Sequence, residues 1–251
     1  MAPWLSLEKE PGGWTVVDHN GLREIVDAMD QPREQYPSVQ LFVGGNTKTQ
    51  ALRTLYPYNN FGRSHRLGLA RVHLSELPRP EPVVIVESGI QSHSEAWPRR
   101  AALKQQHHIR RSYDRSHDEV RDLLYRQVLL PLAHTVCFFP EDLASSNSVE
   151  VIQQLLVAWQ VPPPAGEAGG ATLHPHMMVV LTKGPEPRVS RERIERDLSA
   201  AIVPHIAAAV TVVDLRDRSG LSRVSRFQPL KQALAGQQEA ARTMRAAARL
   251  L

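Results

Sequence analysis

The segment from Val39 to Leu52 has the residue types and spacing of a loop that binds phosphate. It reads VQLFVGGNTKTQAL, with a short apolar run, Gly44 and Gly45 at a turn, and then a helix start. In a working loop of this kind, backbone N–H groups surround the phosphates, a lysine neutralises their charge and a hydroxyl binds Mg²⁺. The pattern needs a glycine, four residues, and then Gly-Lys-Ser/Thr. Counted from Gly44, those last three positions hold Thr49, Gln50 and Ala51.

A lysine is present in the loop, two residues before the expected position. Lys48 and its neighbours Thr47 and Thr49 suit the first turn of an ordinary surface helix, although a rearranged loop would bring Lys48 to a phosphate. A buried phosphate without lysine and Mg²⁺ loses charge-assisted hydrogen bonds of about 1.5–3 kcal/mol each. The segment therefore predicts a nucleotide-binding scaffold without its catalytic equipment.

The elements that would position this loop alternate between strand and helix. Continuous apolar runs are typical of strands covered on both faces by helices, and the chain has VVIV at 83–86, TVCFF at 135–139, MMVVL at 177–181 and VTVV at 210–213. Further strands are expected at 14–17, 39–43 and 71–74, the last forming a hairpin with 83–86. Helices are expected at 21–29, 47–56, 118–130, 145–159 and 190–203, followed by two helical stretches that end at residue 251.

This alternation predicts an α/β fold with a mostly parallel central sheet flanked by helices. Ligands of such sheets bind beyond the carboxyl ends of the strands, so the loops after Val43, Val86, Leu181 and Leu215 are expected to meet there. Residues 140–142, Pro-Glu-Asp, are expected to form a simple turn, and the polar, histidine-rich stretch 91–117 has no clear periodicity.

The order of these segments resembles the P-loop GTPase-like superfamily. The phrase QYPSVQLFVG at 35–44 looks like the entry to the GTPase-like domain of large fungal intracellular proteins. The resemblance covers residues 35–216 and implies a three-layer fold of the P-loop NTPase or small-GTPase type. It divides the chain into a strand–helix extension at 1–34, a GTPase-like α/β domain at 35–222 and a basic helical tail at 223–251.

The resemblance also implies where other nucleotide contacts would lie. The Asp-x-x-Gly element falls on residues 86–89, which keep Gly89 but have Val86 where the metal-directing aspartate is expected; Glu87 could substitute only with a slip of one residue. The base-reading element, Asn/Thr-Lys-x-Asp, falls on residues 182–185, where proline replaces the aspartate. Residues 67–70 offer no hydroxyl for Mg²⁺. The candidate residues of a vestigial nucleotide site are Gly44, Gly45, Lys48, Thr49, Gly89, Thr182 and Lys183.

Other chemistry has less support in the residue spacing. The eleven histidines do not show the paired spacing that places two metal ligands on one helix face. Cys137 lies within an apolar run, as a core residue would. Ser88 follows a strand, but the glycine that precedes a nucleophilic serine in an elbow is absent. No metal site and no catalytic nucleophile are therefore expected.

Composition and charge limit the partners. The net charge is +4, and residues 188–251 carry 12 Lys/Arg against 6 Asp/Glu, so the basic character belongs to the tail. No aromatic residues alternate with these arginines, which favours a solvated helix face over nucleic-acid binding. The longest apolar runs are far shorter than the roughly 20 residues of a membrane-spanning helix. A lone cysteine and the absence of a secretory signal indicate a cytoplasmic protein.

The sequence as a whole predicts a catalytically degenerate GTPase-like domain, or pseudo-GTPase, that acts as an intracellular protein-interaction or regulatory module. It is expected to have a protein partner and no cofactor. The alternative is an active P-loop nucleotide hydrolase with a non-standard phosphate loop, which would bind GTP or GDP with Mg²⁺. An enzyme or auxiliary protein of unrelated chemistry on the same scaffold also stays open, since a fold does not fix a function.

Overall fold

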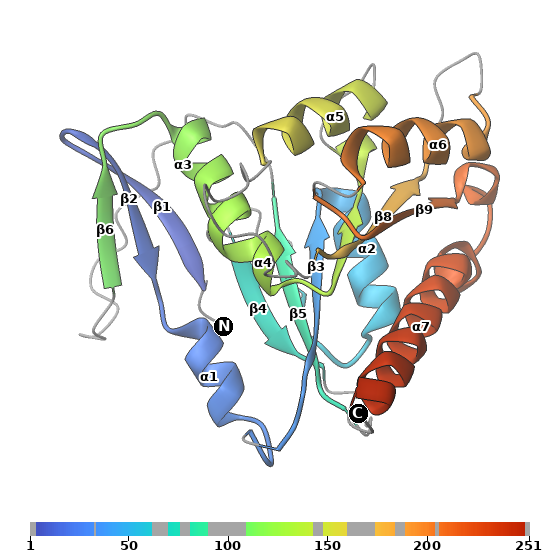
Figure 1. The fold of residues 1–251 in the computed structure, drawn as a ribbon, viewed down its shortest axis with the longest axis horizontal. Coiled ribbons are helices and arrows are strands. Elements are labelled where there is room, and N and C mark those ends of the chain that lie inside the picture. Colours follow the sequence, from blue (N-terminus) through green and yellow to red (C-terminus); the bar gives the residue numbers. More distant parts are fainter. Residues whose placement is uncertain are drawn as a thin grey trace.

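A computed structural model describes residues 4–32, 34–61, 70–75, 81–89, 109–142, 148–159, 174–183, 189–203 and 206–248. In these ranges the strands form one sheet of nine, with helices on both faces (Figure 1). The strand order is β6-β2-β1-β4-β5-β3-β7-β8-β9. The strands are β1 (Leu5–Glu10), β2 (Gly13–Asp18), β3 (Ser38–Val43), β4 (Ala70–Leu74), β5 (Val83–Ser88), β6 (Ile109–Tyr113), β7 (Thr135–Phe138), β8 (His176–Leu181) and β9 (Ala209–Asp214).

The sheet has a parallel half and an antiparallel half. Strands β5, β3, β7, β8 and β9 run parallel to one another. Strand β4 pairs antiparallel with β5, as the predicted hairpin requires, and β1, β2 and β6 continue the sheet in antiparallel pairs. The predicted α/β class is therefore confirmed, and the five parallel strands place the ends of β3, β5, β7 and β8 at one edge.

Two hydrophobic cores lie on opposite faces of the sheet because neighbouring residues of a strand point to opposite sides. On one face, Leu41 and Val136 belong to the core that α3 (His117–Leu124), α5 (Ser148–Ala158) and α6 (Arg191–Ile202) cover. On the other face, Phe42 and Cys137 belong to the core that α2 (Asn46–Leu55) and α7 (Arg223–Ala248) cover. This arrangement explains the continuous apolar runs of the central strands and gives three layers (Figure 1).

The remaining helical segments are short. Helix α1 (Gly21–Asp27) follows β2, a π-helical turn (Tyr125–Leu129) joins α3 to α4 (Leu130–Leu132), and single 3₁₀ turns lie at Pro140–Asp142 and Arg216–Arg218. The prediction of one α-helix over 118–130 is wrong in this respect, because the π turn interrupts it. Such turns recur at functional sites, and this one carries the buried Tyr125.

Three predictions of elements need correction. Strand β1 was not expected, because four of the six residues of its sequence LSLEKE are polar, yet it pairs with β2 over its full length. Strand β6 lies within the stretch that has no periodicity, and its pairing with β2 supplies the missing stabilisation. The last two helical stretches are one helix, α7, which contains Pro229. Phe227 and Leu230 are buried on either side of this proline, so packing holds the helix through it.

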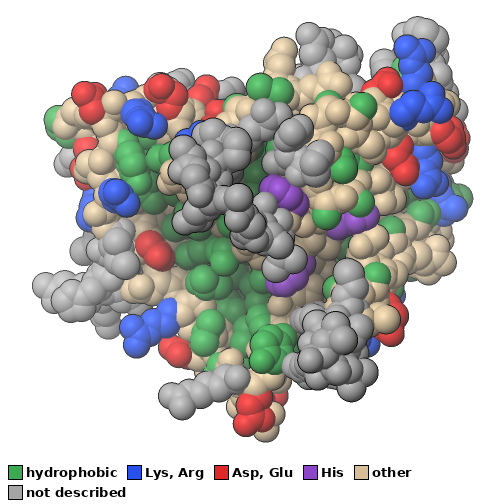
Figure 2. Space-filling model, in the orientation of Figure 1, with side chains coloured by type: hydrophobic (Ala, Val, Ile, Leu, Met, Phe, Trp, Pro, Cys, Tyr) green, Lys and Arg blue, Asp and Glu red, His purple; other side chains and the backbone are tan. Residues whose placement is uncertain are grey.

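The surface seen in Figure 2 carries a hydrophobic area between the positions that α1 and α4 have in Figure 1. Exposed large hydrophobic residues of the described chain include Val26 on α1, Tyr36 before β3 and Leu132 on α4. In the described part of the chain no helix is long and apolar enough to span a membrane.

Candidate functional site

The candidate site begins where β3 gives way to α2. Gly44 has a φ of +154°, in a region that side-chain-bearing residues rarely adopt, and a Cβ there would come within 2.8 Å of the Cβ of Phe139. Gly45 is the N-cap of α2, whose first residue is Asn46. The two glycines thus allow the chain to turn sharply against the loop after β7, and the N–H groups of the first turn of α2 face that loop.

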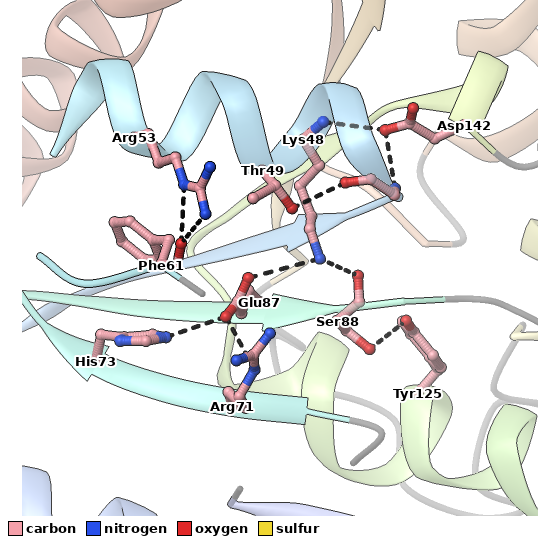
Figure 3. A network of polar contacts seen from close by, with 11 residues as sticks. Lys48, Thr49, Arg53, Phe61, Arg71, His73, Glu87, Ser88, Tyr125 and Asp142 are labelled. Atoms are coloured by element: carbon pink, nitrogen blue, oxygen red, sulfur yellow. Dashed lines mark hydrogen bonds and ion pairs between the residues drawn. The ribbon is translucent and has the colours of Figure 1, made fainter. Parts of the chain in front are cut away.

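The carboxylate of Asp142 binds the N–H groups at the start of α2. Its Oδ2 accepts hydrogen bonds from the backbone N–H groups of Gly45 and Lys48 at 2.8 and 3.0 Å, and its Oδ1 accepts one from Thr47 at 3.0 Å. A helix N-terminus carries partial positive charge and unpaired N–H groups, so it favours an anion. In this protein the anion at that position belongs to the chain itself (Figure 3).

The neighbouring residue binds a different loop. The carboxylate of Glu141 accepts hydrogen bonds from the backbone N–H of Thr182 at 2.9 Å to Oε1 and 2.7 Å to Oε2, and the Thr182 hydroxyl also donates to it. Thr182 follows β8 directly, at the position expected to read a base. The turn at residues 140–142 therefore joins the start of α2 to the loop after β8, using one carboxylate for each.

Lys48 is buried, so the prediction that it lies on the surface of an ordinary helix start is wrong. Only 5% of its side chain is exposed, and its Nζ donates a hydrogen bond to the Ser88 carbonyl oxygen at 3.1 Å. The nearest carboxylate oxygen, Oε2 of Glu87, lies 3.7 Å from Nζ. Burial lowers the pKa of Lys48 from its ordinary value, although the charge of Glu87 opposes this effect.

Glu87 is the centre of a buried ionic network. Its Oε1 lies 3.0 Å from Nε of Arg71 and 3.2 Å from Nε2 of His73, both on β4. Burial alone would raise the pKa of Glu87, but the hydrogen bond with His73 and the charges of Lys48 and Arg71 outweigh it and hold the pKa below its ordinary value. Glu87 is therefore an ionised partner of three basic groups rather than a free ligand for a metal ion.

Two hydroxyl contacts complete the site. The Tyr125 hydroxyl, in the π turn, donates to Oγ of Ser88 at 2.6 Å, and burial raises the pKa of Tyr125, which keeps this donor protonated. The Thr49 hydroxyl donates to the carbonyl oxygen of Gly45 at 3.0 Å. The hydroxyl next to Lys48 is thus used within the first turn of α2, and Figure 3 shows both contacts around the Lys48 side chain.

The predicted site residues divide into two groups. Gly44, Gly45, Lys48 and Thr49 lie together at the start of α2, and a Cβ on Gly89 would lie 3.8 Å from the Gly44 carbonyl oxygen. Thr182 and the exposed Lys183 follow β8 and are joined to the first group through the turn at 140–142. The expected gathering of the loops after Val43, Val86 and Leu181 is therefore confirmed for the described residues.

Sequence reasoning missed the residues that hold these loops together. The sequence alone predicts a simple turn for Glu141 and Asp142. It matches Glu87 to the metal-directing aspartate only after a shift of one residue. One signal could have found the first two, since an adjacent pair of carboxylates directly follows a buried strand at the edge where ligands bind. Nothing in the sequence identifies Arg71 and His73, because only the pairing of β4 with β5 brings them to Glu87.

Among the residues that the structure describes, no group of three or more His, Cys, Asp or Glu side chains could hold a metal ion. Cys137 is fully buried in β7 as expected for a core residue, and burial raises its pKa. The histidine that takes part in the site, His73, contacts the carboxylate of Glu87.

Comparisons by sequence find no match for the chain, whereas comparisons by structure find solved structures that align with most of it. No protein-family profile matches the chain, and no curated protein matches it either. Among solved structures, the Arl6 BBS3 small GTPase from Trypanosoma brucei with bound GppNp aligns over 80% of this chain and 99% of its own, with a TM-score of 0.41 and 10% identity. The mammalian SRP receptor aligns over 79% of this chain and 99% of its own, with a TM-score of 0.38 and 12% identity.

Proposed function

We propose that this protein is a pseudo-GTPase, a GTPase-like α/β domain that does not turn over nucleotide and acts in the cell as a protein-interaction or regulatory module. The observation that carries the proposal is the contact of Asp142 with the start of α2. Its carboxylate accepts the N–H groups of Gly45, Thr47 and Lys48, which are the donors that a phosphate would need.

The negative charge of Asp142 opposes the binding of a nucleotide phosphate at this position. A phosphate placed at the same N–H groups would meet the negative charge of Asp142, and it would have to replace hydrogen bonds to a charged group worth about 1.5–3 kcal/mol each. Lys48, the nearest cation of the loop, is already engaged with Ser88 and Glu87. The protein's own groups therefore satisfy the site without a ligand.

Catalysis would need more than binding. Phosphoryl transfer depends on positioned phosphates and on metal ions that neutralise the developing charge. The position expected for the metal-directing aspartate is the buried Val86, and the neighbouring Glu87 is held by Arg71 and His73. These contacts support the loss of hydrolysis that the altered motifs predict.

An interaction role is supported by the surface. Exposed apolar areas rimmed by polar residues are typical of protein–protein contacts. Figure 2 shows a hydrophobic area between α1 and α4. Val26 on α1, Tyr36 before β3 and Leu132 on α4 are 41, 57 and 42% exposed. The charged residues Arg23 and Asp27 of α1 are also more than two-thirds exposed. Such a surface suits a protein partner.

A nucleotide stability panel tests the proposal. Thermal unfolding of the full chain is measured with GTP, GDP, ATP and ADP, each with and without Mg²⁺. We expect no saturable stabilisation, whereas a ligand at a hundredfold excess over its Kd would add about 2.7 kcal/mol. A saturable Mg²⁺-dependent shift with phosphate release that disappears in Lys48→Ala but persists in Lys183→Ala, an exposed lysine, would overturn the proposal.

The second candidate is an active nucleotide hydrolase with a shortened loop. The observation that favours it is the burial of Lys48 and Thr49 side by side on the first turn of α2, with Nζ of Lys48 beside the end of β5. A lysine followed by a hydroxyl residue is the pair that a phosphate loop uses. This candidate predicts the Mg²⁺-dependent shift that the first one excludes, so the same panel decides between them.

A further inference from the structure

Charge is distributed unevenly between the two ends of the sheet. Residues 1–34 carry 3 Lys/Arg against 7 Asp/Glu, a balance of −4, whereas residues 215–231 carry 5 Lys/Arg against 1 Asp/Glu, a balance of +4. The first segment contains β1, β2 and α1 in the antiparallel half of the sheet, and the second follows β9 at the edge of the parallel half. Figure 1 shows α1 and the start of α7 on opposite sides of the molecule. Segments of opposite charge therefore lie at opposite ends of one chain.

The surface of α1 combines acidic and apolar side chains. Glu24, Asp27 and Asp30 are exposed, and Val26 is 41% exposed. Arg23 is the only basic residue in the sequence of α1, and its Nε lies 4.0 Å from Oδ2 of Asp27. This end of the molecule therefore presents an excess of carboxylates together with an apolar side chain.

The start of α7 and the loop before it combine basic and apolar side chains. Leu221 and Val224 are 50 and 68% exposed, and Arg223 between them is exposed as well. Nη1 of Arg218 donates a hydrogen bond at 3.0 Å to the carbonyl oxygen of Ser225, which holds the loop against the first turn of the helix. This end of the molecule therefore presents two apolar side chains among basic ones.

We propose that these two surfaces bind each other between copies of this protein, which associate head to tail. Residues 24–30 form the acidic surface, and residues 218–224 form the basic surface. Contact between unlike surfaces brings opposite charges together, whereas contact between two like surfaces would place equal charges face to face. Because the two surfaces differ, the contact is heterologous, so it adds one molecule after another instead of closing as a symmetric dimer.

The inference deepens the proposed interaction role, because it names a second copy of the chain as the partner of the α1 surface. Attraction between exposed charges is modest, and salt screens it, since the Debye length falls from about 10 Å at 0.1 M to about 3 Å at 1 M ionic strength. The exposed apolar side chains add a contribution that salt does not screen. The association is therefore expected to be reversible, of the transient class, and weaker at high salt.

Analytical ultracentrifugation of the full chain tests the association over a range of protein concentrations, at about 0.1 M and about 1 M NaCl. We expect the weight-average mass of wild type to rise with concentration at the lower salt, and to rise less at the higher salt. Arg223→Glu and Asp27→Lys each reverse the charge of one surface, and each should lower the association constant at least about tenfold. Arg223 is the first residue of α7 and Asp27 the last of α1, so both changes suit the helix dipole and should leave the fold intact.

A mixture of the two variants tests the head-to-tail arrangement itself. The Arg223→Glu chain keeps the acidic surface and the Asp27→Lys chain keeps the basic one, so the native contact forms between them. The equimolar mixture should therefore associate, although neither variant does so alone. The controls Arg115→Glu and Asp114→Lys make the same charge changes at exposed residues between β6 and α3, and they should associate like wild type.

Four results would overturn the inference: a wild type that stays monomeric, a loss in only one of the two variants, a mixture that stays monomeric, or an equal loss in the controls. Should either variant fail to fold, Val224→Asp replaces Arg223→Glu and Asp30→Lys replaces Asp27→Lys, since both positions are exposed. The nucleotide panel is independent of these results. A monomeric wild type leaves the pseudo-GTPase proposal standing, and a Mg²⁺-dependent nucleotide shift overturns that proposal without changing the measured association.

Discussion

At the scale of single residues, Glu87 determines the electrostatics of the site. Its buried carboxylate lies 3.0–3.7 Å from basic groups on α2 and β4, namely Lys48, Arg71 and His73. An isolated buried carboxylate would be costly, and the three partners offset that cost. The buried Lys48 depends on the same carboxylate, so the two charges hold α2 against β5.

Replacing Glu87 with glutamine should change how stability depends on pH. The folded-state pKa of Glu87 lies below its ordinary value of 4.5, so ionisation favours the folded state. This contribution is complete above the unfolded pKa and is lost as the pH falls through the folded pKa. Wild type should therefore lose stability below about pH 4.5, and Glu87→Gln should lose less over that window while costing about 1–3 kcal/mol at neutral pH.

Urea unfolding at several pH values measures this effect. The matched control is Glu24→Gln, which alters an exposed carboxylate on α1. The control should keep the wild-type dependence on pH and the wild-type stability at neutral pH. Equal pH profiles for wild type and Glu87→Gln would show that the buried network does not contribute to acid unfolding.

At the scale of elements, α7 shows how packing overrides local sequence signals. The helix runs from Arg223 to Ala248 with Pro229 inside it, although proline removes a helical hydrogen bond. Phe227, Leu230 and Leu234 are buried in the core that α2 also covers. Residues from 237 to 243 are partly or fully exposed, so among the side chains that the structure describes the buried ones lie in the first half of the helix.

This division predicts unequal effects of two changes in α7. Leu230→Ala should lower the free energy of unfolding by about 2–5 kcal/mol, because it empties part of a fully buried position. Deletion of residues 237–251 should cost less than that substitution, since the side chains described in this segment, 237–243, are all at least partly exposed. Chemical denaturation compares the two, with the exposed Lys231→Ala as the control. A truncated chain that fails to fold would contradict this interpretation of α7.

At the scale of the whole molecule, the sheet joins two unequal halves. Strand β7, in the middle of the parallel half, pairs on both sides and is buried on both faces. Strand β6 pairs only with β2 in the described part of the chain, and Arg110 and Arg111 are exposed on it. In the residues that the structure describes, strand β1 is aligned with β4 through one residue pair, Leu5 with Ala70. The antiparallel half is therefore attached by fewer backbone contacts than those within the parallel half.

Hydrogen exchange should follow this asymmetry. Amides of β3 and β7 are expected to exchange slowest, near the rate set by global unfolding, and those of β6 fastest among the strands, because local opening costs least where burial and pairing are least. Mass spectrometry of deuterium uptake at the peptide level measures the order. Protection of β6 equal to that of β7 would show that the nine strands open as one cooperative unit.

Much of the architecture could be predicted because its cause is local. The runs at 83–86, 135–139 and 177–181 are apolar at nearly every position, which predicts strands between two helical layers. The glycines at 44 and 45 predict the turn into α2. Strands β1 and β6 could not be predicted, since their polar residues are stabilised by pairing with β2. The predicted division at residues 34 and 222 stays a prediction, although β1 and β2 belong to the same sheet as β4.

The sequence by itself determined the residue types of the loop, the alternation of strand and helix, and the departure of the later motifs from the GTPase-like pattern. Only the tertiary structure decided how those residues are used. It buried Lys48 beside Glu87, and it brought Asp142, 94 residues further along the chain, to the N–H groups of α2. The reason is physical: hydrogen bonds and ion pairs depend on distance in space, and parallel strands bring loops from distant parts of the chain to one edge.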